Sequence, residues 1–223
     1  MGARNAIVIG GTGEIGKAVL ARLRAEGLRA VCASIDVSPE TPRDIRVDVT
    51  DEASVALMFD KAEAELGPIA LLINCSGTGV FAPIPEISAD AWRSTIDVNL
   101  TGAFLCAREA FKRMKAQGGG RIIHLGSVSD HLTLAGNAAY AASKHGVRGL
   151  TGVLNEEGKA CSVRATLLSL GAVYTSFWHS RPEFSPDDML SVDDVAQTIW
   201  EIAQKPLNVR VDELRLVPPK GVL

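Results

Sequence analysis

Tyr140 and Lys144 are the residues whose types and spacing point most directly to chemistry. They begin and end the segment YAASK, and residues four apart lie on the same face of a helix. A lysine ammonium beside a phenol favours the phenolate, because opposite charges attract. Such a tyrosine can accept a proton from an alcohol or donate one to a carbonyl oxygen. The pair predicts proton transfer to or from the oxygen of an alcohol or carbonyl compound. The alternative is a surface lysine beside a core tyrosine, which would have the same spacing.

A third polar residue, Ser127, follows a predicted strand at 121–125. Open α/β folds place their sites at the carboxyl edge of the sheet, where this residue would lie. Its hydroxyl is suited to hydrogen-bonding a substrate oxygen and holding it against Tyr140.

A glycine-rich turn, GGTGEIG, lies between the apolar run 6–9 and the amphipathic segment 16–26. Glycines at such a junction let the backbone approach a pyrophosphate, which the free N–H groups at the helix N-terminus bind. A glycine pattern alone is a weak signal, but this one has a strand before it and a helix after it. We therefore expect a dinucleotide site formed by Gly10, Gly11, Thr12, Gly13, Glu14, Ile15 and Gly16.

The end of the second predicted strand bears on which dinucleotide binds. An acidic residue there reads the ribose hydroxyls of NAD and repels the extra phosphate of NADP. Asp36 lies two residues beyond that position, Ser34 occupies it instead, and no Arg or Lys stands beside Ser34. Both are candidate ribose contacts, but Asp36 is equally well interpreted as an ordinary turn residue. The choice between NAD and NADP stays open.

Apolar runs and amphipathic segments alternate along the whole chain, which predicts a mostly parallel sheet with helices on both faces. Strands are expected at residues 6–9, 30–33, 45–47, 69–73, 121–125, 163–168 and 214–217. Helices are expected at residues 16–26, 51–66, 89–99, 101–116, 137–157 and from 191 onward. Residues 1–223 are thus predicted to form a single doubly wound, Rossmann-type α/β domain without a linker.

The composition suits a globular protein and argues against other classes. Hydrophobic residues make up 47%, charged residues 22%, and the formal net charge is −3. Without a basic run, nucleic acid is not an expected partner, and no stretch approaches the roughly 20 apolar residues of a membrane span. The N-terminus leads directly into a strand and leaves no room for a signal peptide, so the cytoplasm is the expected location. The spacing of the cysteines and histidines predicts neither a metal site nor a disulfide.

Together these motifs resemble the short-chain dehydrogenase/reductase family over nearly the whole chain. The matching pieces occur in the family's order: GGTGEIG at 10–16, DVT at 48–50, NCSG at 74–77, Asn99, Ser127, Tyr140 with Lys144, and Gly171 with Thr175. The resemblance implies an NAD(P)-dependent oxidoreductase that moves a hydride between nicotinamide and a carbonyl or secondary alcohol. A 3-oxoacyl compound or another small ketone or alcohol would be the substrate.

The resemblance also implies a role for each matched residue. Tyr140 would be the general acid and base, and Ser127 would position the substrate oxygen. Lys144 would assist Tyr140 and hydrogen-bond the nicotinamide ribose, and Asn99 would hold a water that relays protons to Lys144. The other matches would hold the dinucleotide: Asp48 and Val49 at the adenine, Asn74, Ser76 and Gly77 on the adenosine side, and Gly171, Val173 and Thr175 at the nicotinamide end.

Four positions depart from the family pattern. Ile9 replaces a threonine, Glu14 a glycine, Cys75-Ser76 an Asn-Ala pair, and Leu170 the proline before Gly171. These changes bear on cofactor affinity and loop shape and leave the four predicted catalytic residues intact.

The segment near 175–190 is expected to cover the substrate. Phe177 and Trp178 would form an apolar wall and Arg181 would meet an anionic substrate, although Trp178 is equally suited to packing the loop down. Other residues with chemical potential are assigned more simply: Asp130 and His131 as pocket lining, His145 as structural, and His124 as core.

Family members usually pair the helices that hold Asn99 and Tyr140 with those of a second subunit, which implies a homodimer or homotetramer. Five apolar residues in these segments exceed what one sheet face needs: Phe104, Phe111, Val147, Leu150 and Leu154.

Two alternative functions stay open. One is a nucleotide-binding regulator or scaffold without catalysis, although both Tyr140 and Lys144 are present. The other is a nucleotide-sugar isomerase or dehydratase, for which this chain is too short to hold the usual C-terminal substrate domain.

Overall fold

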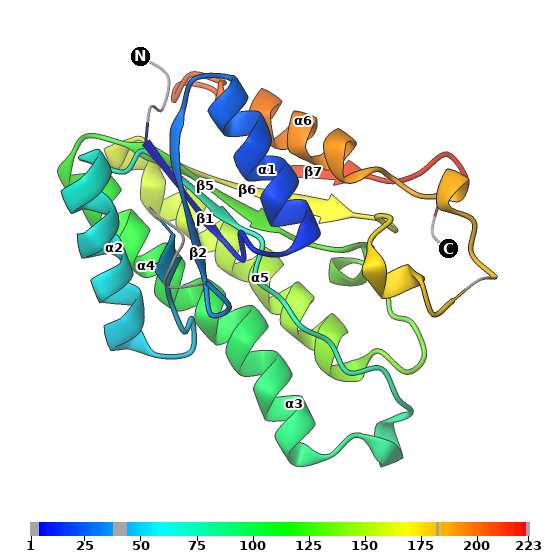
Figure 1. Cartoon of the computed structure of the whole chain (residues 1–223). Coiled ribbons are helices and arrows are strands. Elements are labelled where there is room, and N and C mark those ends of the chain that lie inside the picture. Colours follow the sequence, from blue (N-terminus) through cyan, green and yellow to red (C-terminus); the bar gives the residue numbers. More distant parts are fainter. Residues whose placement is uncertain (1–4, 38–43, 182, 222–223) are drawn as a thin grey trace.

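The computed structural model describes residues 5–37, 44–181 and 183–221. Within these ranges the strands form one sheet in the order β3-β2-β1-β4-β5-β6-β7 (Figure 1), and every neighbouring pair is parallel. The strands are β1 (Asn5–Ile9), β2 (Arg29–Ser34), β3 (Ile45–Arg46), β4 (Leu71–Asn74), β5 (Gly120–Leu125), β6 (Val163–Leu170) and β7 (Glu213–Leu216). The predicted doubly wound α/β architecture is confirmed.

Helices cover both faces of the sheet (Figure 1). On one face lie α1 (Glu14–Ala25) and α6 (Val192–Ala203), and on the other α2 (Glu52–Leu66), α4 (Gly102–Ala116) and α5 (Ala138–Glu157). These helices bury apolar residues against the strands, which gives one large apolar cluster per face and a third, small one of Ala103, Val147 and Leu167. Helix α6 begins where predicted, because the Ser191 hydroxyl and the Asp194 carboxylate form a capping box.

The strand order places the loops of interest at one edge. The chain runs from β1 outward through β2 and β3, then returns to β4 on the other side of β1. At such a reversal, open α/β sheets have a crevice at the carboxyl ends of their strands. Backbone hydrogen bonds join the segments there: Gly10 N–H donates to Ala33 O over 2.8 Å, and Cys75 N–H donates to Ile9 O over 2.9 Å.

The prediction of separate helices at 89–99 and 101–116 is wrong. Helix α3 (Ala89–Ile96) continues through a π-helical turn (Asp97–Thr101) into α4 without leaving helical backbone angles. Gly102, the first residue of α4, lets the helix lie close to Val49, where an added Cβ would come within 2.8 Å of a Val49 methyl group. Asn99 therefore lies inside the helix, in the wider turn.

The strand predicted at 163–168 is two residues too short. Ser169 and Leu170 extend β6 by pairing with Arg215 and Leu216 of β7. A proline at position 170 could not donate a ladder hydrogen bond, so the leucine found there is compatible with this extension.

Two of the five apolar residues assigned to a subunit interface belong to the core instead. Val147 and Leu154 are buried against the sheet, and Phe111 and Leu150 are partly buried. Only Phe104 among them is a large exposed side chain.

Short 3-10 turns connect the longer elements. They lie at Ile84–Glu86, Val128–Asp130, Gly158–Cys161, Ser176–Trp178 and Pro186–Asp188. No helix in the described part of the chain is long and apolar enough to cross a membrane. Nor do three or more His, Cys, Asp or Glu side chains there gather as metal ligands, and the four cysteines are free thiols.

Candidate active site

Tyr140 and Lys144 lie on the sheet-facing side of α5, as their four-residue spacing predicts. The Lys144 side chain is buried, and its Nζ donates a hydrogen bond to Leu125 O at the end of β5 over 2.9 Å. This bond leaves Nζ 5.4 Å from the centroid of the Tyr140 ring. The ammonium and the phenol therefore face one small volume at the carboxyl edge of the sheet.

Asn99 reaches the same volume from the π-helical turn. Its Oδ1 accepts the Thr78 N–H over 2.8 Å, and its Nδ2 donates to Thr78 O over 2.8 Å and to Ser143 Oγ over 3.0 Å. A Cβ added to Gly77 would lie 3.6 Å from Asn99 Oδ1 and 3.8 Å from Lys144 Nζ. The missing side chain at Gly77 thus leaves room between the amide and the ammonium.

Ser127 lies one residue beyond the end of β5 and caps the 3-10 turn that follows. Its Oγ accepts the Ser129 N–H over 3.2 Å, so the hydroxyl hydrogen is free to point elsewhere. Its own N–H donates to Asp130 Oδ2 over 3.1 Å, and the Ser169 hydroxyl donates to the same oxygen over 2.6 Å. The Ser127 N–H is therefore held by the Asp130 carboxylate of the same turn, which Ser169 of β6 also contacts.

The expectation that Asp130 lines a pocket is wrong. Its side chain is fully buried, and its second oxygen contacts His131 Nδ1. On the other side of the imidazole, Nε2 lies 3.3 Å from Glu213 Oε2. The buried carboxylate is held by hydrogen bonds because an unpaired charge would be costly there, and its role is to support the Ser127 turn.

His124 lies beneath Lys144 in β5 and is a core residue, as predicted. Its Nδ1 lies 3.0 Å from Thr151 Oγ1 of α5. Burial, with a smaller contribution from the Lys144 charge, lowers the pKa of His124 to about 4. The ring is neutral near pH 7 and adds no positive charge beside the ammonium.

The glycine-rich turn has the shape that a bound pyrophosphate needs. Gly10 has φ +70°, and a Cβ added to Gly16 would lie 2.3 Å from Gly10 O. Gly13 precedes α1 without a side-chain cap, so in the described part of the chain no capping side chain occupies the N–H groups at this helix end. A backbone cradle closed to side chains and rich in N–H donors fits a dinucleotide phosphate.

Glu14 has an observed contact that the sequence did not predict. Its Oε1 accepts hydrogen bonds from Ser176 N–H over 2.7 Å and from Ser176 Oγ over 2.6 Å. These two bonds lower the pKa of the Glu14 carboxyl. The residue that departs from the family's glycine thus joins the first turn of α1 to the segment after Thr175.

The residues predicted on the adenosine side form hydrogen bonds with other residues of the loops at this edge of the sheet. The Ser34 and Thr12 hydroxyls hydrogen-bond each other over 2.7 Å. Asp48 Oδ1 accepts the N–H and hydroxyl of Thr50, which lowers the pKa of Asp48, and Asn74 Oδ1 accepts the N–H and hydroxyl of Ser76 in the same way. Two further candidates differ in exposure: Val49 is buried and Asp36 is exposed.

The predicted nicotinamide-end residues follow β6. Gly171 N–H donates to Leu216 O over 2.8 Å, and an added Cβ would lie 2.8 Å from Pro218. Val173 forms a parallel bridge with Leu190, and Thr175 precedes the 3-10 turn at Ser176–Trp178. The segment is therefore anchored at both ends before it reaches its aromatic residues.

Aromatic rings extend outward from Tyr140. The Phe81 ring lies 5.6 Å from Tyr140 and 6.0 Å from Phe177, centroid to centroid. Phe177 is 46% exposed and contacts Trp178 edge to face at 5.3 Å. Trp178 Nε1 donates to Val173 O over 2.9 Å, so Trp178 packs the loop down while Phe177 forms an open apolar wall.

Sequence reasoning did not find Phe81. Its only signal is its place in the loop that leaves the carboxyl end of β4, where side chains meet the edge of the site.

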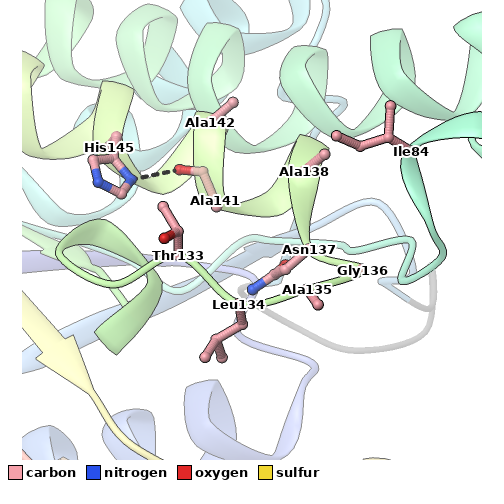
Figure 2. A pocket seen from close by; sticks show the side chains of 10 residues that line it. All are labelled: Ile84, Thr133, Leu134, Ala135, Gly136, Asn137, Ala138, Ala141, Ala142 and His145. Carbon is pink, nitrogen blue, oxygen red and sulfur yellow. Dashed lines mark hydrogen bonds between the residues drawn. The ribbon is translucent and has the colours of Figure 1, made fainter.

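A surface pocket of about 440 Å³ lies on the other side of α5. Ala138, Ala141, Ala142 and His145 of the helix line it together with the loop around Leu134 (Figure 2). None of Asn99, Ser127, Tyr140 and Lys144 lines it. His145, predicted to be structural, is exposed, and its Nδ1 lies 3.0 Å from Ala141 O.

The known sequences that resemble this chain include several dehydrogenases. The family model for short chain dehydrogenases matches residues 4–185. D-threitol dehydrogenase of Mycolicibacterium smegmatis is 38% identical over 157 residues, which are 70% of this chain and 60% of the relative. The 2-dehydro-3-deoxy-L-rhamnonate dehydrogenase (NAD(+)) of a Sphingomonas species is 35% identical over 201 residues, 84% of this chain and 79% of the relative.

A third relative, the cis-4-hydroxycyclohexanecarboxylate dehydrogenase of Sinomonas cyclohexanicum, is 37% identical over 147 residues, 66% of this chain and 54% of the relative. The matched part thus spans less than two thirds of the first and third relatives. Among solved structures, a short-chain type dehydrogenase/reductase from Mycobacterium ulcerans superposes with a TM-score of 0.85 at 24% identity, covering 95% of this chain and 88% of that one. The superposition shows a shared fold.

Proposed function

The chain belongs to the short-chain dehydrogenase family, and on that premise we propose that it is an NAD(P)-dependent oxidoreductase acting on a carbonyl or secondary alcohol. The observation that carries the proposal is the placement of Lys144 Nζ 5.4 Å from the Tyr140 ring. Asn99 borders the same volume through its bonds to Thr78 and Ser143.

The proposed proton chemistry belongs to Tyr140. Its hydroxyl donates a proton to the substrate oxygen when a carbonyl is reduced and accepts it when an alcohol is oxidised. The Lys144 ammonium stabilises the charge that develops on the phenol oxygen. The free hydroxyl hydrogen of Ser127 hydrogen-bonds the substrate oxygen, and Asn99 holds a water that restores the proton by way of Lys144.

The proposed cofactor is NAD or NADP, which supplies or accepts the hydride when bound. The cradle at Gly10 and Gly16 and the N–H groups of α1 would hold its pyrophosphate. Asp48, Val49, Asn74, Ser76 and Gly77 would hold the adenosine side, with Ser34 or Asp36 at the ribose. Lys144, Gly171, Val173 and Thr175 would hold the nicotinamide end.

The proposed substrate is small. The named relatives act on a polyol, a sugar acid and a hydroxylated ring acid, all of which carry secondary alcohols or the matching ketones. The open wall of Phe81 and Phe177 supports a substrate with an apolar part next to the reacting carbon.

We further propose that residues 1–223 act as one domain in a cytoplasmic homodimer or homotetramer. The exposed Phe104 on α4 and Val153 on α5 support association through these helices. Sedimentation that finds only a 23.6 kDa species would contradict the assembly.

The test is Tyr140→Phe, with Tyr174→Phe as control because Tyr174 is the only other tyrosine in the chain. Removing the proton donor should lower turnover of a ketone and alcohol panel at least ~10³-fold. Fluorescence titration with NADH and NADPH should find the dinucleotide affinity unchanged and identify the preferred form. Unchanged turnover in Tyr140→Phe, or a native protein that binds dinucleotide without turnover on any substrate, would contradict the proposed function.

A further inference from the structure

Arg181 presents a cation at the outer end of the aromatic rings. Its Cζ lies 4.3 Å above the Phe177 ring centroid and 5.7 Å from that of Trp178. Among the described residues, its guanidinium forms neither a hydrogen bond nor an ion pair with a carboxylate. The side chain is half-buried, so its donors stand at the protein surface ready for a ligand.

An apolar strip separates this guanidinium from Tyr140. The strip consists of Phe81, which contacts Tyr140, and Phe177, which contacts Phe81 and carries Arg181 on its face. Both phenylalanines are close to half exposed. A molecule with its reacting carbon at Tyr140 and its body along the two rings would bring its far end to Arg181.

The loop that carries Arg181 is anchored at several points. Glu14 holds the backbone and hydroxyl of Ser176, Trp178 Nε1 donates to Val173 O, and Arg181 N–H donates to Trp178 O over 2.9 Å. A ligand therefore meets a guanidinium whose loop is largely ordered already, which lowers the entropy cost of binding.

We propose that Arg181 binds the carboxylate of the substrate, so that the enzyme acts on oxo or hydroxy acids with an apolar segment between the carboxylate and the reacting carbon. Arginine suits this role because its planar donors match a carboxylate with two parallel hydrogen bonds. Stacking on Phe177 leaves the edge of the guanidinium, where the N–H groups lie, available for those bonds. The substrate class rests on the proposed function, whereas carboxylate binding does not.

The test compares 4′-acetylbiphenyl-4-carboxylate, whose two rings can follow Phe81 and Phe177, with its methyl ester, which keeps the apolar body and the ketone and removes the charge. The native enzyme should favour the acid. Arg181→Gln should lower kcat/KM for the acid roughly tenfold or more, the effect of losing a charge-assisted hydrogen bond, and change it for the ester less than about twofold. The kcat/KM of Arg181→Lys for the acid should lie between those of the native enzyme and Arg181→Gln, because lysine keeps a charge without the planar pair of donors.

Two controls separate this role from others. Arg93→Gln removes an exposed arginine on α3 and should leave kcat/KM unchanged for both the acid and the ester. NADH and NADPH titrations of Arg181→Gln should match the native protein. Equal losses for acid and ester, no loss for either, no native preference for the acid, or weaker dinucleotide binding would each overturn the proposal.

Calorimetric titration of 4′-acetylbiphenyl-4-carboxylate and its methyl ester keeps the two proposals apart. If the native protein shows no turnover yet binds the acid more tightly than the ester, and Arg181→Gln removes that difference, the proposed function fails and the carboxylate site stands. If turnover is normal but binding of the acid is the same in both proteins, the carboxylate site fails alone.

Discussion

The two sides of Tyr140 are built in different ways. Beneath it, the floor consists of Asn99, His124, Ser143 and Lys144, all buried, and each with at least one hydrogen bond to the protein. Outside it, the rim consists of Phe81, Phe177, Trp178 and Arg181, which meet through ring and cation–π contacts. The floor is held by hydrogen bonds, whereas the rim is held mainly by ring contacts, with one side-chain hydrogen bond from Trp178 Nε1 to Val173 O.

This difference separates two tasks. Proton transfer needs its groups within hydrogen-bond reach and correctly aimed, and buried polar groups are costly when a partner is lost. A change in the floor should therefore affect stability and every substrate alike. Ring contacts at the rim can be exchanged at small cost, so a change there should affect particular substrates and leave the fold intact.

The largest effect in this comparison is expected from Asn99→Ala. Thr78 and Ser143 lose their partners, which should cost about 2 kcal/mol in the free energy of unfolding. Without the amide that orders the floor, kcat should fall about 10–100-fold for all substrates. Urea unfolding and a substrate panel measure both. A loss of kcat for only some substrates would contradict the prediction, because it would mean that Asn99 acts as a rim residue.

The second effect concerns pH and His124. The unfolded histidine takes up a proton near pH 6.5, whereas the folded one does so only near pH 4. Stability from this group is therefore full above pH 6.5 and falls as the pH drops toward 4, by at most about 3 kcal/mol. Between pH 4 and 6.5, the free energy of unfolding should therefore change more steeply with pH in the native protein than in His124→Gln. His145→Gln removes an exposed histidine and should keep the native slope; an equal slope in all three proteins would contradict the prediction.

The smallest effect is expected from Phe177→Leu. The Phe177 side chain is close to half exposed, and a contact between such a ring and a bound substrate is worth about 0.5–1.5 kcal/mol. KM should therefore change about 2–10-fold, by different factors for different substrates. Thermal unfolding should stay within about 0.5 kcal/mol of the native protein, as for other exposed positions. A loss of stability comparable with that of Asn99→Ala would remove the distinction between rim and floor.

Local patterns predicted the fold and the floor well. Strand and helix positions follow from apolar periodicity, Ser191 and Asp194 mark a helix start, and the spacing of Tyr140 and Lys144 places both on one helix face. The helix running through residues 97–101 was missed because its wider turn has no distinct residue pattern.

Contacts between segments that are far apart in the chain could not be predicted from the sequence. Glu14 meets Ser176, which is 162 residues away, and the sequence shows only an acid where a glycine is usual. Asp130 was interpreted as pocket lining because nothing local reveals that Ser169 donates to it across the sheet. Phe81 was missed for the same reason, since only the folded chain brings the loop after β4 against Tyr140 and Phe177.

The wide turn at Asp97–Thr101 acts as a one-residue insertion in an otherwise regular helix. Each residue of an α-helix advances the side chains by about 100°, so the extra residue changes the angular register between α3 and α4. Shortening the turn by one residue would restore even winding and swing Asn99 away from Thr78 and Ser143, or force α4 to rotate off the sheet. The amide at the floor is thus aimed by helix phase rather than by a loop.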